Sequence, residues 1–171
     1  TIQYITIAST GNAVDFGDLT VARSILGACS NVTRGVFAGG YSSNFDNTID
    51  YVTIATVGNA TDFGDLTLSI GALAGASDGT YGLFGGGKYI DGVTTDSNVI
   101  AYVTIATTGN ATDFGDLTLA RQQLGACASD TRAVWGGGNN DAGTRFNNLD
   151  YVTIATPSNA TDFGDLLAGT D

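Results

Sequence analysis

The phrase "YVTIATVGNATDFGDL" at residues 51–66 decides the fold of this chain, because four near-identical copies of it are present. The other copies begin at Tyr4, Tyr102 and Tyr151, so successive copies start 47, 51 and 49 residues apart. Self-similarity at such a period is typical of propellers, solenoids and other repeat arrays. Because the tyrosine and the phenylalanine of each copy are always 12 residues apart, this half of the unit has a fixed length.

A second stretch of constant length precedes each of the last three copies. It reads "TVARSILGACSNVTRGVFAGG" at residues 20–40 and recurs at residues 67–87 and 118–138. All variation in length falls after the glycines that end this stretch, within residues 41–50, 88–101 and 139–150. Each unit therefore combines a constant frame with one variable segment.

Strand signals inside the unit are short and alternate with period two. No helical periodicity is present, and the third strand of the unit carries no charged residue on either face from Tyr51 onward, which indicates a sheet covered on both sides. We expect an all-β chain with four strands per unit, bounded by glycine, asparagine, aspartate or serine. In the first full unit these strands are predicted at residues 26–30, 34–40, 49–56 and 60–66.

The composition excludes several classes of function. With 17 acidic and 6 basic residues the chain carries a net charge of -11, and such a surface repels nucleic-acid phosphates. No apolar run of about 18 residues and no basic leader followed by an apolar run is present, so we expect no membrane insertion. Because the sequence does not begin with methionine, we expect a processed or excerpted chain.

The two cysteines occupy the same position of two different units. Cys29 lies in "LGACSN" and Cys127 in "LGACAS", and the middle unit has Ala76 there. Equivalent positions of non-adjacent units are too far apart for a disulfide. We expect two free thiols at a site that requires a small buried residue.

The strands that end in paired glycines resemble kelch repeats, which build four-stranded blades of β-propellers. The residues that carry this resemblance are "RGVFAGG", "YGLFGGG" and "RAVWGGG", with the connections "TVAR" and "TLAR". The tryptophan usual in the fourth strand is replaced by phenylalanine in every copy. The resemblance implies a single repeat domain over residues 1–171 with an incomplete ring: a half blade at 1–19, full blades at 20–66, 67–117 and 118–166, and a tail at 167–171.

The phrase "IDYVTIATxGNATDFGDLT" also resembles tandem repeats in large virion and tail-fibre proteins of marine tailed phages. This likeness implies a non-enzymatic structural or recognition module in a virion, with other virion proteins, further copies of the chain or a host surface as partners. A carbohydrate-binding, lectin-like propeller of a secreted or cell-surface adhesin is the alternative. An enzyme is disfavoured because the sequence offers no histidine and no paired nucleophile and base.

The paired aspartates of "DFGD" have two interpretations. Calcium accepts six to eight oxygen ligands, and each unit offers two carboxylates for such a site. In the second interpretation one aspartate caps a turn while the other meets the arginine at Arg23 or Arg121 or faces water. We favour the second and expect neither a metal nor another cofactor.

The segment "NAT" at Asn59, Asn110 and Asn159 and "NVT" at Asn31 fit the acceptor sequence for N-glycosylation, but glycine followed by asparagine is also typical of a tight hairpin. We therefore predict a tight turn between the third and fourth strands, with asparagine in a structural role. Phe37 and Trp135 are assigned to the core.

The variable segments carry the candidate binding residues. Since insertions in repeat architectures map to loops on one face, which is often the binding face, we expect these segments to meet on one side of the molecule. Neutral drift in exposed turns is the alternative explanation. The residues that would contact a partner are Tyr41, Phe45, Lys88, Tyr89, Arg145 and Phe146.

Overall fold

The computed structural model describes residues 1–170, in which strands are the only extended regular elements. That range includes no helix that could cross a membrane. Three antiparallel sheets of four strands each follow one another along the chain. The prediction of an all-β chain with four strands per unit is confirmed.

Within each sheet the strands follow one another in chain order. In the second sheet, the chain forms a separate hairpin between the second and third strands. The first sheet contains β3 (Gly27–Ser30), β4 (Arg34–Ala38), β5 (Thr48–Thr53) and β6 (Thr61–Asp65). The second contains β7 (Ala74–Ser77), β8 (Tyr81–Gly85), β11 (Val99–Thr104) and β12 (Thr112–Asp116). The third contains β13 (Gly125–Ala128), β14 (Arg132–Gly136), β15 (Phe146–Thr153) and β16 (Thr161–Thr170).

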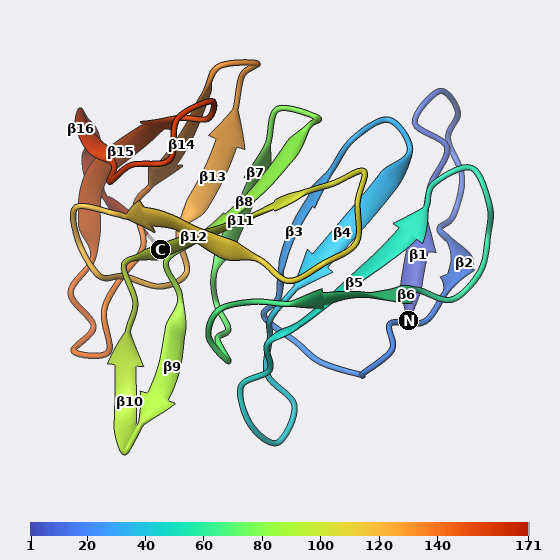
Figure 1. Cartoon of the computed structure of the whole chain (residues 1–171), viewed down its shortest axis with the longest axis horizontal. Helices are drawn as coiled ribbons and strands as arrows, with labels where there is room; N and C mark the ends of the chain where they lie inside the picture. The colour runs from blue at the N-terminus through green and yellow to red at the C-terminus, as the bar shows by residue number, and fades with distance from the viewer. Residues whose placement is uncertain (171) are drawn as a thin grey trace.

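Two further hairpins complete the structure. One joins β1 (Ile2–Tyr4) to β2 (Val14–Gly17) at the N-terminal side, and the other joins β9 (Lys88–Asp91) to β10 (Val93–Asp96) between β8 and β11. The N-terminal hairpin and the three sheets lie side by side in sequence order, with β1 and β2 at one side of the view and β16 at the other (Figure 1). Residues 1–170 do not close into a ring.

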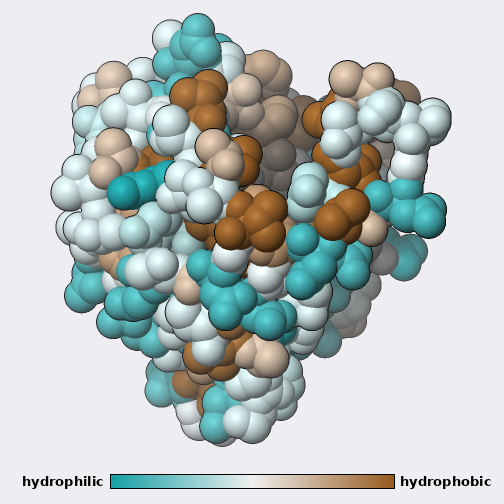
Figure 2. Space-filling model, turned by 90° about the vertical axis from the view of Figure 1, so that its right-hand side faces the viewer, coloured by the Kyte–Doolittle hydropathy of each residue, from teal (hydrophilic) through white to brown (hydrophobic). Residues whose placement is uncertain are grey.

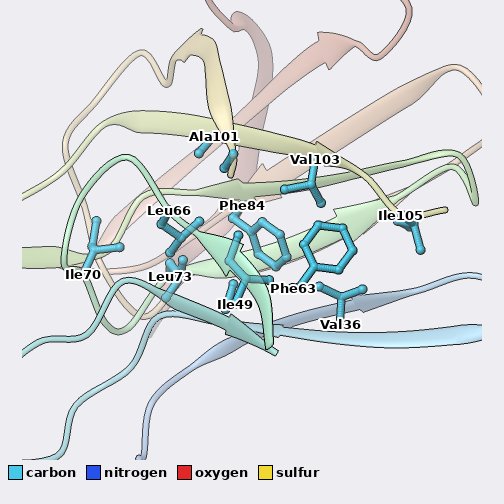
Figure 3. Packing of buried hydrophobic residues seen from close by; sticks show 12 residues of the cluster. Val36, Ile49, Phe63, Leu66, Ile70, Leu73, Phe84, Ala101, Val103 and Ile105 are labelled. Carbon is cyan, nitrogen blue, oxygen red and sulfur yellow. The ribbon is translucent and has the colours of Figure 1, made fainter. Parts of the chain in front are cut away.

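Apolar side chains fill the spaces between neighbouring sheets. Phe63 of β6 and Phe84 of β8 lie at the centre of the cluster between the first and second sheets, next to Val36, Val103 and Ile105 (Figure 3). A second cluster between the second and third sheets surrounds Trp135, whose indole nitrogen donates a hydrogen bond to the Ala74 carbonyl at 3.1 Å. Trp135 is fully buried, as predicted, whereas Phe37 is only half-buried.

The paired glycines at the end of the second strand permit close contact between consecutive units. Gly39 and Gly40 have φ angles of 63° and 122°, which side chains other than glycine adopt with strain. A β-carbon on Gly39 would lie 2.4 Å from the Ile70 carbonyl oxygen, and the amide of Gly40 donates a hydrogen bond to that oxygen at 2.8 Å. The glycine pair is thus required by backbone packing.

The turn that contains Asn59, Asn110 or Asn159 hydrogen-bonds each sheet to the preceding one instead of forming a two-residue hairpin, so the predicted tight turn is wrong. The chain already turns back earlier, where Thr56 donates to the Thr53 carbonyl. This leaves the Asn59 side chain free to accept a hydrogen bond from the Asp18 amide at 3.0 Å, and the Ala60 amide donates to the Asp18 carbonyl at 2.8 Å.

The same contact recurs along the chain. Asn110 and Asn159 accept hydrogen bonds from the amides of Asp65 and Asp116, and the following alanines donate to the carbonyls of the same aspartates. We call these segments the docking turns, with the sequence Gly-Asn-Ala at residues 11–13, 58–60 and 109–111 and Ser-Asn-Ala at residues 158–160. We call the Phe-Gly-Asp segment that receives a docking turn the docking edge. Each docking edge therefore belongs to a "DFGD" motif and acts through its backbone.

Candidate recognition surface

The three variable segments lie along the same side of the molecule, at the bottom of Figure 1. Residues 88–96 form the β9–β10 hairpin, whose turn contains Gly92 with a φ of 73°. Residues 41–47 and 139–145 are loops, each closed by an isolated bridge, between Tyr41 and Phe45 in one and between Asn139 and Arg145 in the other. We call the surface formed by these three segments the variable side.

Two aromatic rings and a cation line a shallow pocket on the variable side. The rings of Tyr41 and Phe45 meet edge to face with their centroids 5.2 Å apart, and Lys88 lies across from them. The pocket has a volume of about 340 Å³ and is completed by Ile25, Ile90 and Thr94. Tyr41 is 40% exposed, so its ring and hydroxyl are open to a partner.

Polar contacts tie the second variable segment to the third. The ammonium of Lys88 lies 3.3 Å from Asp141 Oδ1, and the Gln122 side-chain amide donates to the same oxygen at 2.9 Å. The Asp141 amide donates to Asp96 Oδ2 at 3.0 Å. Because the ion pair is partly exposed, it contributes little to stability, and it places the lysine ammonium beside Asp141.

Asp96 has an unusual environment within this set of contacts. Burial, together with the nearby Asp141 carboxylate, raises the pKa of Asp96 above its ordinary value, although the Asp141 amide and Lys88 act in the opposite direction. Its Oδ1 atom is buried without a hydrogen-bond partner. Two carboxylates beside one lysine form an ion-pair network, and no group of three metal-ligating side chains is found within residues 1–170.

The six residues singled out from the sequence are not all brought together. Tyr41, Phe45 and Lys88 line one pocket, whereas Tyr89 is half-buried and packs against the core between the first two sheets. Arg145 and Phe146 belong to the third segment, where Phe146 pairs with Thr170 of β16 and is half-buried.

Several residues that line the pocket or pair with its lysine were not identified from the sequence. Ile90, Thr94 and Asp141 lie inside the variable segments, but nothing in their spacing distinguishes them from their neighbours. Ile25 belongs to the constant frame, lines the pocket and has a φ of 48°. Since Ala72 and Gln123 at the equivalent positions also have positive φ angles, the backbone conformation is a property of the frame.

The carboxylates of the "DFGD" motifs point mostly into solvent. Seven of the eight aspartates are exposed, and Asp116 is half-exposed. None of them pairs with Arg23 or Arg121, so that part of our second interpretation is wrong. The motif is used for its backbone, which forms the docking edge.

The two arginines pair with aspartates of the third strands instead. Arg23 donates to Asp50 at 2.9 Å, and Arg121 lies 3.0 Å from Asp150 but without the alignment of a hydrogen bond. All four side chains are fully buried. The hydroxyls of Thr20 and Thr118 also donate hydrogen bonds to these carboxylates. The segment that precedes each of these two sheets is therefore held against the third strand of that same sheet.

A second hollow of about 490 Å³ separates the N-terminal hairpin from the first sheet. It is lined by residues 1–3 and by residues of the constant frame, among them Leu19, Ala22, Leu26 and Phe37. Because the lining does not include a variable segment, we assign this hollow to packing between consecutive units.

Comparison with protein-family models gave no match, and comparison with curated proteins gave none either. The resemblances to kelch repeats and to tail-fibre repeats rest on the motifs quoted above. The geometry of the variable side is therefore the basis on which a function can be proposed.

Proposed function

We propose that this chain is a non-enzymatic recognition module made of kelch-like β-propeller blades, which binds a partner through the variable side. In this proposal the three sheets are full blades and the N-terminal hairpin is half a blade. One observation carries the proposal: the segments that differ between units lie together, while the frame around them is nearly duplicated.

The pocket indicates the kind of partner. Tyr41 and Phe45 offer large apolar rings with few rotatable bonds, a composition that is enriched at binding surfaces. Lys88 is the only lysine in a chain of net charge -11, and Asp141 holds it beside these rings. We infer that the partner presents an apolar or aromatic group next to a hydrogen-bond acceptor.

The resemblance of the repeated phrase to repeats in phage virion and tail-fibre proteins leads us to propose a virion or tail fibre as the setting. The partner would then be a neighbouring virion protein or a component of the host surface. A rigid repeated frame that displays variable segments suits such a role, because loops can change without loss of buried contacts.

Carbohydrate binding is the second candidate function, and the exposed ring of Tyr41 favours it. Shallow pockets that combine aromatic faces with a few polar groups are typical of small-ligand sites. A glycan array separates the two candidates, because a lectin-like module would retain defined glycans and a protein-binding module would not.

The experiment that tests the proposal replaces the exposed parts of the variable segments with short Gly-Ser turns. Residues 42–44, 89–95 and 140–144 are exchanged separately, which keeps the bridging residues Tyr41 and Asn139 in place. Binding to host cells and to neighbouring virion proteins is then measured. We expect replacement of 89–95, which removes Ile90 and Thr94 from the pocket, to reduce binding at least tenfold, whereas replacement of 42–44 leaves the pocket residues in place.

A matched control keeps the variable side intact. Val32 is 95% exposed in a turn of the constant frame, and Val32→Ala should bind like the wild-type chain. If all three replacements fold and bind as well as this control, the variable side is not the recognition surface.

A further inference from the structure

The phenylalanine of the docking edge is buried in three units and exposed in the fourth. Phe16, Phe63 and Phe114 are 7%, 2% and 3% exposed, whereas Phe163 is 53% exposed. All four stand at the same position of the same phrase. The difference therefore lies in what covers them.

In the contacts at Phe63 and Phe114, the following unit covers the phenylalanine with the same set of residues. Phe63 shares a cluster with Val103, Ile105 and Ala111, and the same three positions of the next unit surround Phe114. The docking turn lies over the edge at the same place through its hydrogen bonds to the aspartate backbone. A buried phenylalanine and a docked turn are thus two parts of one contact.

The N-terminal hairpin has the residues that cover a phenylalanine in the other contacts. Within residues 1–170, however, no docking edge lies beneath them. Ile5, Ile7 and Ala13 stand at the positions of Val103, Ile105 and Ala111. Ile5 is 61% and Ile7 95% exposed, and the turn at residues 11–13 is exposed as well. Figure 2 shows the face of the molecule on this side, where apolar residues surround a hollow.

The docking edge of β16 keeps the conformation in which the other edges receive a turn. Gly164 has a φ of 134°, close to the values of 149°, 145° and 144° at Gly17, Gly64 and Gly115. A β-carbon on any of those three would lie 2.3 to 2.5 Å from a backbone oxygen of the docked turn, whereas nothing lies within 4 Å of that position at Gly164. The edge is preorganised for a contact that residues 1–170 leave open.

We propose that a second copy of this chain docks here head to tail, with its turn at residues 11–13 on the edge at residues 163–165. In this contact the Ala13 amide donates to the Asp165 carbonyl, the Asn12 side chain accepts from the Asp165 amide, and Ile5 and Ile7 cover Phe163. The three internal contacts are the template for the two hydrogen bonds, and the contacts at Phe63 and Phe114 are the template for the cover over Phe163. The proposal concerns a different surface from the variable side and does not depend on the proposed function.

The contact is heterologous, because the two copies contribute different surfaces. Each copy contributes the docking turn at residues 11–13 and the docking edge at residues 163–165, so association through this contact alone continues into a ring or an open array. The constant frame sets the rotation between units, and the variable sides of successive copies would be repeated along the assembly.

Cross-linking between two differently marked chains tests the proposal. Both carry Cys127→Ala, which reproduces Ala76 of the middle unit, and the remaining Cys29 is half-buried. One chain also carries Ala13→Cys and the other Asp165→Cys. The chains are mixed near 1 mM, which populates complexes with a Kd of about 1 mM, and treated with a short bismaleimide. We expect the 13–165 product to exceed the 13–13 and 165–165 products at least fivefold.

Two variants show whether the docking turn is responsible. Asn12→Ala in the Ala13→Cys chain should reduce the 13–165 product severalfold, because it removes the acceptor for the Asp165 amide. Thr10→Ala is the matched control, since its position differs between units and the equivalent Val57 is exposed. Circular dichroism and melting curves establish that each variant is folded. Equal yields of the three products, or a yield unaffected by Asn12→Ala, would overturn the proposal.

Discussion

The buried arginine–aspartate pair of the first and third sheets has an apolar counterpart in the second sheet. Ile70 occupies the position of Arg121, and Ala101 that of Asp150. Both Ile70 and Ala101 belong to the apolar cluster between the first two sheets. The site therefore accommodates either an ion pair or two apolar residues. A buried arginine or aspartate at this site requires its oppositely charged partner.

We predict that Asp150→Ala lowers the free energy of unfolding by about 3–5 kcal/mol, because Arg121 remains buried without its partner. The double variant Arg121→Ile with Asp150→Ala reproduces the second sheet and should recover most of this loss. Urea denaturation of the single and double variants measures both effects. A double variant no more stable than Asp150→Ala would show that the two positions are not coupled in this way.

The two cysteines differ although their sequence positions are equivalent. Cys29 lies against Gly82 between two sheets, and burial raises the pKa of its thiol to about 12. Cys127 lies on the outer face of the third sheet and is exposed, so the prediction that both thiols are buried is wrong for Cys127. The sequence identifies the position but does not say whether another sheet covers it.

We expect one fast-reacting thiol in the native protein, because the thiolate is the reactive form and Cys29 is neutral and enclosed at ordinary pH. A thiol reagent at pH 8 should modify Cys127 rapidly and Cys29 only after unfolding. Cys127→Ala assigns the fast phase, since that variant should show none. Equal rates for the two cysteines in the folded protein would contradict the burial of Cys29.

At the level of strands and turns, the sequence predicted what the units share. The strands expected at 26–30, 34–40, 49–56 and 60–66 overlap β3 to β6, because the period-two pattern and the bounding glycines repeat in every unit. The docking turn was wrongly predicted to be a hairpin turn. A Gly-Asn pair is compatible both with a turn that closes a hairpin and with a turn that contacts another sheet. The β9–β10 hairpin was missed because it occurs in one unit only.

The glycines of the docking edges allow the cost of an unfavourable φ angle to be measured separately from the cost of a steric clash. Gly64→Ala places a β-carbon 2.5 Å from the Gly109 carbonyl oxygen, whereas Gly164→Ala introduces a similar unfavourable φ in open space. We predict that Gly64→Ala destabilises the protein by about 1–3 kcal/mol more than Gly164→Ala does. Thermal denaturation at low protein concentration gives the comparison. Equal losses would mean that the docked turn does not approach this edge.

For the molecule as a whole, the repeat predicted that the variable segments emerge on one side, and the structure places them there (Figure 1). It could not predict which side chains meet, since residues such as Asp141 and Ile90 have no counterparts in other units. The contact of Lys88 with Asp141 and the pocket with Tyr41 depend on how neighbouring units are placed. That placement is set by the docking turns.

The docking of each unit on the preceding one is the central claim, and amide hydrogen exchange tests it most directly. The amides of Ala60, Ala111 and Ala160 donate to a preceding sheet, whereas Ala13 has the same local sequence position without a docking edge. In dilute protein, we predict strong protection at Ala60, Ala111 and Ala160 and exchange at Ala13 near the rate of an unstructured chain. Exchange at Ala60 and Ala111 as fast as at Ala13 would contradict the docked arrangement.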